Sequence, residues 1–273
     1  MSAYRCSDTP RHSRLLAPLA ARYAGWLGLP AAATADTSDE DPAVVRAMPL
    51  VLRLERDEPP PRSALLEAAA SAAVGVCLDE RSEPGGPWHD EVAPWLAGRI
   101  RKVARRARGT QWHATGELPG VTVTHRGAQV RALLPWRVAQ LPKSVSRLQV
   151  GGTDLPADDP GPPPPGRPVL WLAPDVALTA GKAAAQAGHA TMILAALLAA
   201  DRPAALAGWA QEGYRCAVRV AGAARWSVLA PGAEPERAWR ERGVVAVRDA
   251  GFTEVAPGTV TCLAQLPPPV PSR

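Results

Sequence analysis

Proline and glycine crowd one segment in the middle of the chain, and this segment constrains the fold more than any other feature. Residues 151–168 read GGTDLPADDPGPPPPGRP. Proline removes a backbone donor and glycine weakens element interiors, so the segment is predicted to form neither a helix nor a central strand. Such a composition is typical of a semi-rigid spacer between folded units. We therefore predict a domain boundary here.

The composition on either side of this spacer is that of a globular protein. The chain has 273 residues, of which 47% are hydrophobic and 21% charged. This is sufficient for two domains of ordinary size. The predicted division is an N-terminal helix with an acidic linker (1–47), an N-terminal α/β domain (48–150), the spacer (151–168) and a C-terminal domain (169–273).

Strands and helices alternate in the hydrophobic pattern of both predicted domains. The N-terminal domain is expected to contain a strand at 49–55, helices at 62–78 and 88–108, and a hairpin of strands 121–124 and 128–134. The C-terminal domain is expected to contain strands at 169–172, 214–220, 244–248 and 259–266, and helices at about 181–200, 203–211 and 234–242. The halves share a loose strand, helix, helix, strand order, but no residue-level repeat is visible. The pattern predicts an α/β fold, with a mixed, mostly four-stranded sheet flanked by helices in the C-terminal domain and a second α/β domain before it.

The N-terminal segment combines arginines with an apolar stretch, as a secretory signal does. However, Arg22 interrupts that stretch, while Leu15, Leu19, Tyr23 and Trp26 fall on roughly one side of a helix together with Leu27. The segment is therefore predicted to be an amphipathic docking helix. No run approaches the roughly 20 apolar residues that a transmembrane helix needs, so no membrane partner is expected.

The four cysteines favour a reduced environment. Cys6, Cys77, Cys216 and Cys262 lack CxxC spacing, and no histidines stand at metal-ligand intervals from them. A cytoplasmic protein with unpaired thiols, no metal site and no cofactor is the simplest account.

The positive charge of the chain is concentrated in its first half. Residues 1–150 hold 20 of the 31 Lys and Arg but only 15 of the 26 Asp and Glu, and the net charge of +5 lies entirely there. One predicted helical run has six cations and no acid: Arg99, Arg101, Lys102, Arg105, Arg106 and Arg108. This run is either a solvated helix face or a surface that binds the phosphates of a nucleic acid.

A lysine opens the alanine-rich helix of the C-terminal domain, where its charge opposes the helix dipole. Lys182, Gln186 and His189 are spaced by four and three residues and therefore share one helix face. Such a face is the wall of an active site or an ordinary surface. His189 alone favours a packed helix residue, because no metal ligand stands at zinc spacing.

An aspartate follows a β-branched strand near the C-terminus. Asp249 lies after the strand 244–248, at the end where α/β sheets commonly bind ligands. The alternative is a carboxylate that bonds the amides of its own turn. The turn Pro257-Gly258 is expected to bring Thr253 and Thr261 near each other across a bend of the chain.

Two ordered motifs, GKAAAQAGHA at 181–190 and RDAG at 248–251, are followed by Thr253 and by PGTVT at 257–261. Together they resemble the second, archaeal and eukaryotic type of peptidyl-tRNA hydrolase, in a longer, bacterial-looking version. The resemblance covers residues from about 169 to 266 and leaves the first 150 outside. Phe252 occupies a position that the family often fills with a basic or polar residue, and its ring is suited to stack on a terminal base.

The resemblance implies hydrolysis of the ester between a peptide and the terminal ribose of tRNA, by a compact α/β domain and without a metal or cofactor. Residue by residue, it implies catalytic roles for Lys182, Asp249, Thr253 and Thr261, with Gly181, Gln186, His189 and Gly251 as supporting motif residues. It also suggests peptidyl-tRNA as the partner and a homodimer as the assembly.

Ester hydrolysis requires an oriented water and a group that stabilises the developing oxyanion, which Asp249 and Lys182 are able to supply. The leading hypothesis is thus a cytoplasmic peptidyl-tRNA hydrolase whose domain 169–273 cleaves the ester while the six basic residues at 99–108 hold the tRNA. The alternative is a non-catalytic tRNA- or RNA-binding protein on the same scaffold.

Overall fold

Each half of the chain contributes one β-sheet to the structure, which is a computed structural model describing residues 11–267. The first sheet has six strands: β1 (Arg46–Arg53), β2 (Lys102–Ala107), β3 (Gly120–His125), β4 (Ala128–Leu133), β5 (Trp136–Arg137) and β6 (Gln149–Val150). The second sheet has four strands: β7 (Val169–Leu172), β8 (Ala217–Val220), β9 (Val244–Arg248) and β10 (Val260–Gln265).

The two sheets have mixed topology. The first has the order β3-β4-β1-β2-β6, with β5 also paired to β1, and the second has the order β8-β7-β10-β9. In each sheet one pair is parallel, β1 with β2 and β7 with β8. The hairpins β3-β4 and β9-β10 are antiparallel. Parallel pairs need a helical crossover, which places helices on the faces of both sheets.

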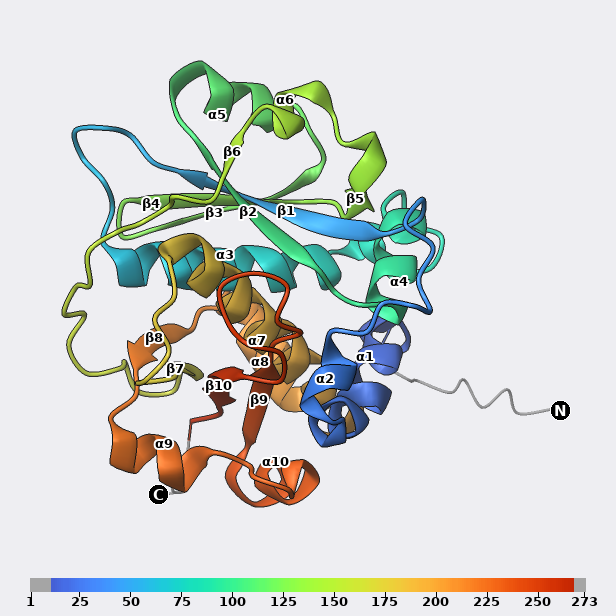
Figure 1. The fold of residues 1–273 in the computed structure, drawn as a ribbon, viewed down its shortest axis with the longest axis vertical. Coiled ribbons are helices and arrows are strands. Elements are labelled where there is room, and N and C mark those ends of the chain that lie inside the picture. Colours follow the sequence, from blue (N-terminus) through green and yellow to red (C-terminus); the bar gives the residue numbers. More distant parts are fainter. Residues whose placement is uncertain (1–10, 268–273) are drawn as a thin grey trace, which may run out of the picture.

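The helices form layers between and outside the sheets (Figure 1). They are α1 (Arg11–Gly28), α2 (Ala31–Thr34), α3 (Arg62–Cys77), α4 (His89–Ala97), α5 (Gly109–Gly116), α6 (Lys143–Ser146), α7 (Ala180–Asp201), α8 (Pro203–Gln211), α9 (Ala223–Leu229) and α10 (Pro235–Arg242), with 3-10 turns at Glu80–Ser82 and Val138–Gln140. The helices α3 and α7 lie between the sheets, α5 and α6 cover the outer face of the first, and α9 and α10 cover the outer face of the second.

One apolar core runs through both halves. It includes Leu50 and Leu52 of the first sheet, Leu170 of the second, and most of the buried faces of α3 and α7. Small residues, mainly alanine, allow these two helices to pack closely between the sheets. The spacer 151–168 contains no helix or strand, as its composition predicts. The division of the chain into four domains stays a prediction.

The α/β architecture and the mixed four-stranded sheet of the C-terminal half are confirmed. The strands at 169–172 and 244–248 and the helix at 203–211 end where the hydrophobic pattern predicts. The N-terminal hairpin is also confirmed, with Arg126 and Gly127 at positive φ in its two-residue turn. Such a turn matches the twist of the flanking strands.

The prediction of a helix over 88–108 is wrong in its second half. The helix α4 ends at Ala97, Gly98 is extended, and the basic run continues as strand β2, paired in parallel with β1. Val103 and Ala107 alternate with other residues as well as falling at helical spacing, so the pattern alone fits both structures. Pairing with β1 decides the outcome. The sequence pattern also missed α5, α9 and the short strands β5 and β6.

The prediction that no segment is apolar over membrane length is wrong for the helix α7. It has 22 residues and a mean hydropathy of 1.5, which is long and apolar enough to cross a membrane. However, 89% of its apolar window is buried inside the fold. Among the described residues it is therefore the central core helix, and its hydrophobicity is explained by burial on all sides.

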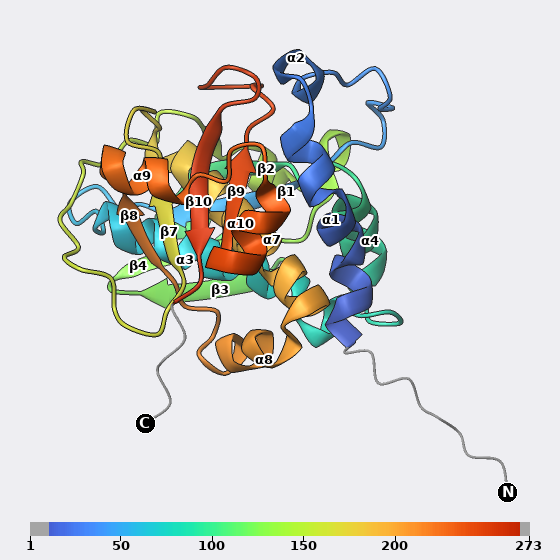
Figure 2. The same cartoon turned by 90° about the horizontal axis from the view of Figure 1, so that it is seen from below.

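The predicted amphipathic helix is α1, and it covers the free edge of the second sheet (Figure 2). Leu15, Leu16, Leu19 and Tyr23 are buried. The Tyr23 hydroxyl accepts a hydrogen bond from the backbone amide of Ala246 on β9 at 2.9 Å. Burial raises the pKa of Tyr23 to about 12. An edge strand is thereby protected from pairing with other chains. Cys77, Cys216 and Cys262 are buried and unpaired, and Cys6 lies outside the described residues.

Candidate functional site

The first turn of α7 holds the predicted lysine. Thr179 caps this helix, because its hydroxyl accepts a hydrogen bond from the Lys182 amide at 3.2 Å. The carboxylate of Glu254 in turn accepts from the Thr179 amide at 2.9 Å and from its hydroxyl at 2.7 Å. A negative charge at the N-terminus complements the dipole that Lys182 opposes. Glu254 was missed in the sequence, where nothing marks its contact with a residue 75 positions away.

The predicted site residues meet around one carboxylate. Lys182 Nζ lies 2.7 Å from Asp249 Oδ2, and Gln186 Nε2 donates to the same oxygen at 2.7 Å. Lys182 Nζ also donates to the Thr253 hydroxyl at 2.9 Å. The Thr261 hydroxyl donates to Gln186 Oε1 at 2.6 Å. Five residues from α7, the end of β9, the following turn and the start of β10 thus form one hydrogen-bonded cluster.

This cluster is partly shielded from water. The side chains of Lys182 and Asp249 are 12% and 9% exposed, and Gln186 and Thr261 are buried. Removal of either Lys182 or Asp249 would leave the other charge shielded from water and without its partner. Thr253 lies on the exposed side of the cluster.

The turn after β9 fixes the orientation of Asp249. The Gly251 amide donates to Asp249 Oδ1 at 2.8 Å, as the Asx-turn alternative predicts. The two roles coexist, because Oδ2 faces Lys182 while Oδ1 bonds the turn. Gly251 has a φ of 83°, and a Cβ there would lie 2.4 Å from the nitrogen of Pro257. Only glycine fits this position.

His189, the remaining polar motif residue of α7, lies away from the cluster around Asp249. Its Nδ1 is 3.1 Å from Nζ of Lys102, which reaches α7 from strand β2. Burial, with the nearby charges of Lys102 and Lys182, lowers the pKa of His189 well below its ordinary value. Burial also lowers the pKa of Lys102 to about 7. A Cβ on Gly181 would lie 3.3 Å from that of Ala104 and 3.5 Å from that of Thr153, so the glycine allows α7 to pack closely against the first sheet.

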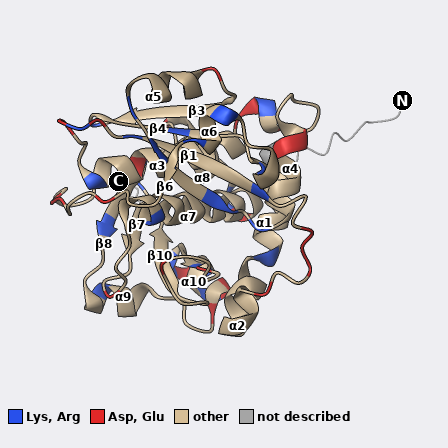
Figure 3. Cartoon of the chain, turned by 45° about the horizontal axis from the view of Figure 1, so that its top comes forward, with Lys and Arg blue, Asp and Glu red and all other residues tan. Residues whose placement is uncertain are grey.

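Most of the six basic residues are engaged within the protein. Arg99 and Arg101 pair with Glu40 of the acidic stretch, and Lys102 is covered by α7. Arg105 donates to the carbonyls of Val145 and Leu148, both at 3.2 Å. Arg106, which bonds Gln149, and Arg108 are exposed. Figure 3 shows basic and acidic positions interspersed over the fold. The run is therefore not one free basic surface.

The N-terminal half contacts the turn that follows Asp249. The guanidinium of Arg101 lies 5.3 Å from the centre of the Phe252 ring, which is 49% exposed. Trp26 Nε1 donates to the Arg248 carbonyl at 2.9 Å, and Arg248 donates back to the Leu27 carbonyl at 2.9 Å. Both contacts anchor the turn from outside. Among residues 11–267, no three His, Cys, Asp or Glu side chains lie close enough to hold a metal ion.

Comparison with known proteins gives one consistent result. The family model described as "Peptidyl-tRNA hydrolase PTH2" matches residues 168–272. A "Peptidyl-tRNA hydrolase" of Thermococcus sibiricus is 35% identical over 101 residues, which are 37% of this chain and 83% of the relative. The corresponding protein of Thermococcus onnurineus is 33% identical over the same shares. No solved structure matches the chain.

Proposed function

Since the chain belongs to the PTH2 family of peptidyl-tRNA hydrolases, we propose that its C-terminal half hydrolyses the ester bond between a peptide, or an N-blocked amino acid, and tRNA. The observation that carries the proposal is the shared contact of Lys182 and Gln186 with one carboxylate oxygen of Asp249. The reaction is hydrolysis of a carboxylic ester, with water as nucleophile, and it releases free tRNA and the peptide acid.

Asp249 is proposed to orient the attacking water. Its carboxylate accepts hydrogen bonds from Lys182, Gln186 and the Gly251 amide. These three donors hold the carboxylate in one orientation, which suits it to keep a water in place. Orientation of the water therefore contributes more than its deprotonation, and correct positioning alone supplies a large part of such rate enhancements.

Lys182 is proposed to stabilise the oxyanion that develops on the ester carbonyl. Its ammonium group bonds both Asp249 and Thr253, and Thr253 lies on the exposed side of the cluster, so a carbonyl oxygen bound on that side would meet this cation. A preorganised cation in a partly water-excluded site stabilises such a charge effectively. Thr253 and Thr261 support the lysine and the amide of Gln186.

The tRNA body is proposed to contact the exposed cations of the basic run, Arg106 and Arg108. Arg99, Arg101, Lys102 and Arg105 have partners within the protein and would have to release them first. The cytoplasmic location and the homodimer stay predictions.

The test is hydrolysis of N-acetyl-aminoacyl-tRNA by purified full-length protein. We expect wild-type turnover and a loss of about 10²–10³-fold in kcat for Asp249→Asn, whose amide keeps the shape of the carboxylate. Salt-sensitive binding of tRNA without turnover by the wild-type protein would support the alternative, a non-catalytic RNA-binding protein. Wild-type protein that neither binds nor hydrolyses the substrate contradicts both functions.

A further inference from the structure

The two sheets share one topology when β5 and β6 are set aside. The order β2-β1-β4-β3 in the first corresponds to β8-β7-β10-β9 in the second, strand for strand in sequence order. In both, the first and second strands are parallel and every other pair is antiparallel. In both, a long helix follows the first strand, α3 in one and α7 in the other.

The registers of the two sheets agree as well. Leu50 pairs with Ala104 on one side and with Ala132 on the other. Leu170 pairs with Val218 and Ala264 in the same way. The equivalence continues in the third strand, where Val121 opposite Ala132 matches Val245 opposite Ala264.

The correspondence extends beyond the strands. The amide of Leu134 donates to the Pro119 carbonyl, and at the equivalent place the amide of Leu266 donates to the Gly243 carbonyl. Each leucine precedes a proline. A random likeness between two α/β sheets does not account for matched registers and a matched closing bond.

The central helices cross as equivalent elements. The Thr191 hydroxyl of α7 donates to the Ala70 carbonyl of α3 at 2.9 Å. A Cβ placed on Gly188 would lie 3.0 Å from that of Ala73. With an offset of 118 residues, Ala70 of α3 is equivalent to Gly188 of α7, and Ala73 is equivalent to Thr191. The contact between Ala70 and Thr191 is therefore equivalent to the contact between Gly188 and Ala73. The halves are thus related by an approximate two-fold rotation through the crossing point.

The counterpart of the active site has lost its chemistry. The helix correspondence places Ala64 where α7 has Lys182, and Ala68 where it has Gln186. The register of β3 places His125 at the position of Asp249. His125 Nε2 lies 2.9 Å from the buried carboxylate of Glu67. In this pair the carboxylate is on the helix α3 and the nitrogen base is on the strand β3. In the C-terminal half the order is the opposite, because Lys182 is on the helix α7 and the carboxylate of Asp249 follows the strand β9.

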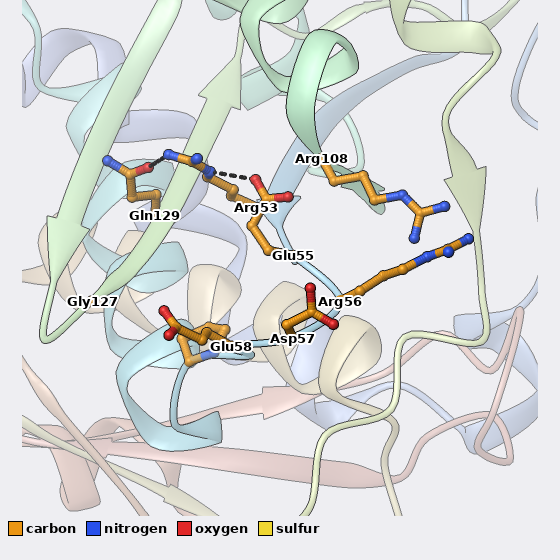
Figure 4. A pocket seen from close by; sticks show the side chains of 9 residues that line it. Arg53, Glu55, Arg56, Asp57, Glu58, Arg108, Gly127 and Gln129 are labelled. Carbon is orange, nitrogen blue, oxygen red and sulfur yellow. Dashed lines mark hydrogen bonds and ion pairs between the residues drawn. The ribbon is translucent and has the colours of Figure 1, made fainter.

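A pocket of about 640 Å³ lies beside that counterpart site (Figure 4). It is lined by the loop between β1 and α3, by Arg108 directly after β2, and by the β3-β4 turn. Its lining residue Gln129 corresponds to Thr261 of the catalytic cluster. The pocket therefore lies beside the position equivalent to the C-terminal cluster; Gln129 lines it, whereas the equivalents of Lys182 and Asp249 do not.

We propose that residues 46–135 are a second, non-hydrolytic copy of the fold at 169–267, and that its pocket binds one or two phosphates of the RNA through Arg56 and Arg108. The phosphate assignment rests on the proposed function, whereas the repeat itself does not. The first copy then acts as a built-in partner domain, which packs on α7 and contacts the tRNA away from the scissile ester.

The charges in the pocket support a small number of phosphate contacts. The side chains of Arg56 and Arg108 are exposed, make no hydrogen bond or ion pair with any residue of 11–267, and extend to the same side of the pocket (Figure 4). Arg53 is already paired with Glu55. Asp57 and Glu58 line another wall and would repel further phosphates. Two guanidinium forks match the geometry of a phosphodiester.

The binding test uses full-length protein and uncharged tRNA, so that it does not depend on hydrolysis. We expect the Arg56→Ala/Arg108→Ala variant to bind about tenfold more weakly, and the slope of log affinity against log salt to fall by about 1–2. The matched control is Arg240→Ala, an exposed arginine of α10 whose one hydrogen bond is to a backbone carbonyl. Affinity and slope equal to those of this control would overturn the pocket assignment.

The second part of the test asks whether the N-terminal copy is truly silent. With Asp249→Asn in the full chain, we expect the residual hydrolysis of N-acetyl-aminoacyl-tRNA, about 10²–10³-fold below wild type, to stay the same when His125→Asn is added. Residual turnover that disappears on a further His125→Asn substitution would show an active second site and overturn this part. Absence of wild-type turnover would contradict the proposed function instead, and it would leave the binding result to stand separately.

Discussion

The N-terminal and C-terminal sheets share a topology but differ in their third connection. Between β3 and β4 the chain turns through Arg126 and Gly127 alone, whereas between β9 and β10 it makes a long excursion over residues 249–259. That excursion contributes Asp249, Thr253 and Glu254, three of the groups that hold Lys182 and its helix. The sheet and the central helix are alike in both halves, so the loop accounts for the difference, because it adds the groups that contact Lys182 and its helix cap.

The N-termini of α7 and α3 differ in the charged residues that they carry. Glu254 and Asp249 compensate Lys182 at the start of α7. With no equivalent loop, α3 has Ala64 at the corresponding position, and Asp158 of the spacer bonds Ser63 beside it. A lysine there would have the Asp158 carboxylate near the helix start but no counterpart of Asp249 to pair with.

The largest effect is expected from removing the cation that distinguishes the active copy. Lys182→Met should lower kcat/KM by about 10²–10³-fold, because the oxyanion and Asp249 both lose their cationic partner. The matched control is Lys143→Met, an exposed lysine of α6, which should change kcat/KM less than twofold. Steady-state hydrolysis of N-acetyl-aminoacyl-tRNA measures both. Similar losses in the two variants would show that the copies do not differ through Lys182.

The sequence predicted the active copy better than the silent one, for physical reasons. The helix α7 and strand β9 were predicted near their observed bounds, and their motif residues meet because Lys182 lies in the first turn of α7 while Asp249 directly follows β9. Strand β2 was missed because its pattern also fits a helix, and only pairing with β1 separates the two. The contact between Lys102 and His189 joins residues 87 positions apart and has no local signal.

The repeat was invisible in the sequence because its spacing is not constant. Leu50 and Leu170 are 120 residues apart, the crossing helices correspond at 118, and Ala132 and Ala264 are 132 apart. Val121 and Val245 are 124 residues apart, so the long loop after β9 accounts for the rise from 124 to 132. A search at one fixed period averages over these shifts, whereas hydrogen-bond registers detect each strand separately.

A smaller effect is expected at the helix crossing, where the two copies meet. Gly188→Ala should lower the free energy of unfolding by about 1–3 kcal/mol, because the new methyl group would press on Ala73 and on the side chain of Lys102. The control is Gly208→Ala in α8, where a Cβ meets nothing within 4 Å and helix propensity favours alanine. Urea unfolding measures both. A Gly188→Ala variant as stable as its control would show that the crossing tolerates expansion.

The smallest effect concerns a charge that only one copy buries. The strand registers match Lys102 with Cys216, so the second sheet has a thiol where the first has an amine. Burial lowers the folded-state pKa of Lys102 to about 7, while that of an unfolded lysine is about 10.4. Between these values the unfolded state binds more protons, so stability should rise with pH, by about 1 kcal/mol from pH 7 to pH 8.

Lys102→Met should remove this rise, and the comparison of urea unfolding at the two pH values isolates it. The groups that face Lys102 titrate outside the window. The pKa of His189 on α7 is lowered well below its ordinary value, and burial raises that of Cys77 on α3 to about 12. Methionine keeps most of the side-chain volume beside Gly188, so packing changes little. An equal pH dependence in both proteins would mean that Lys102 is not the residue that makes the first copy sensitive to pH.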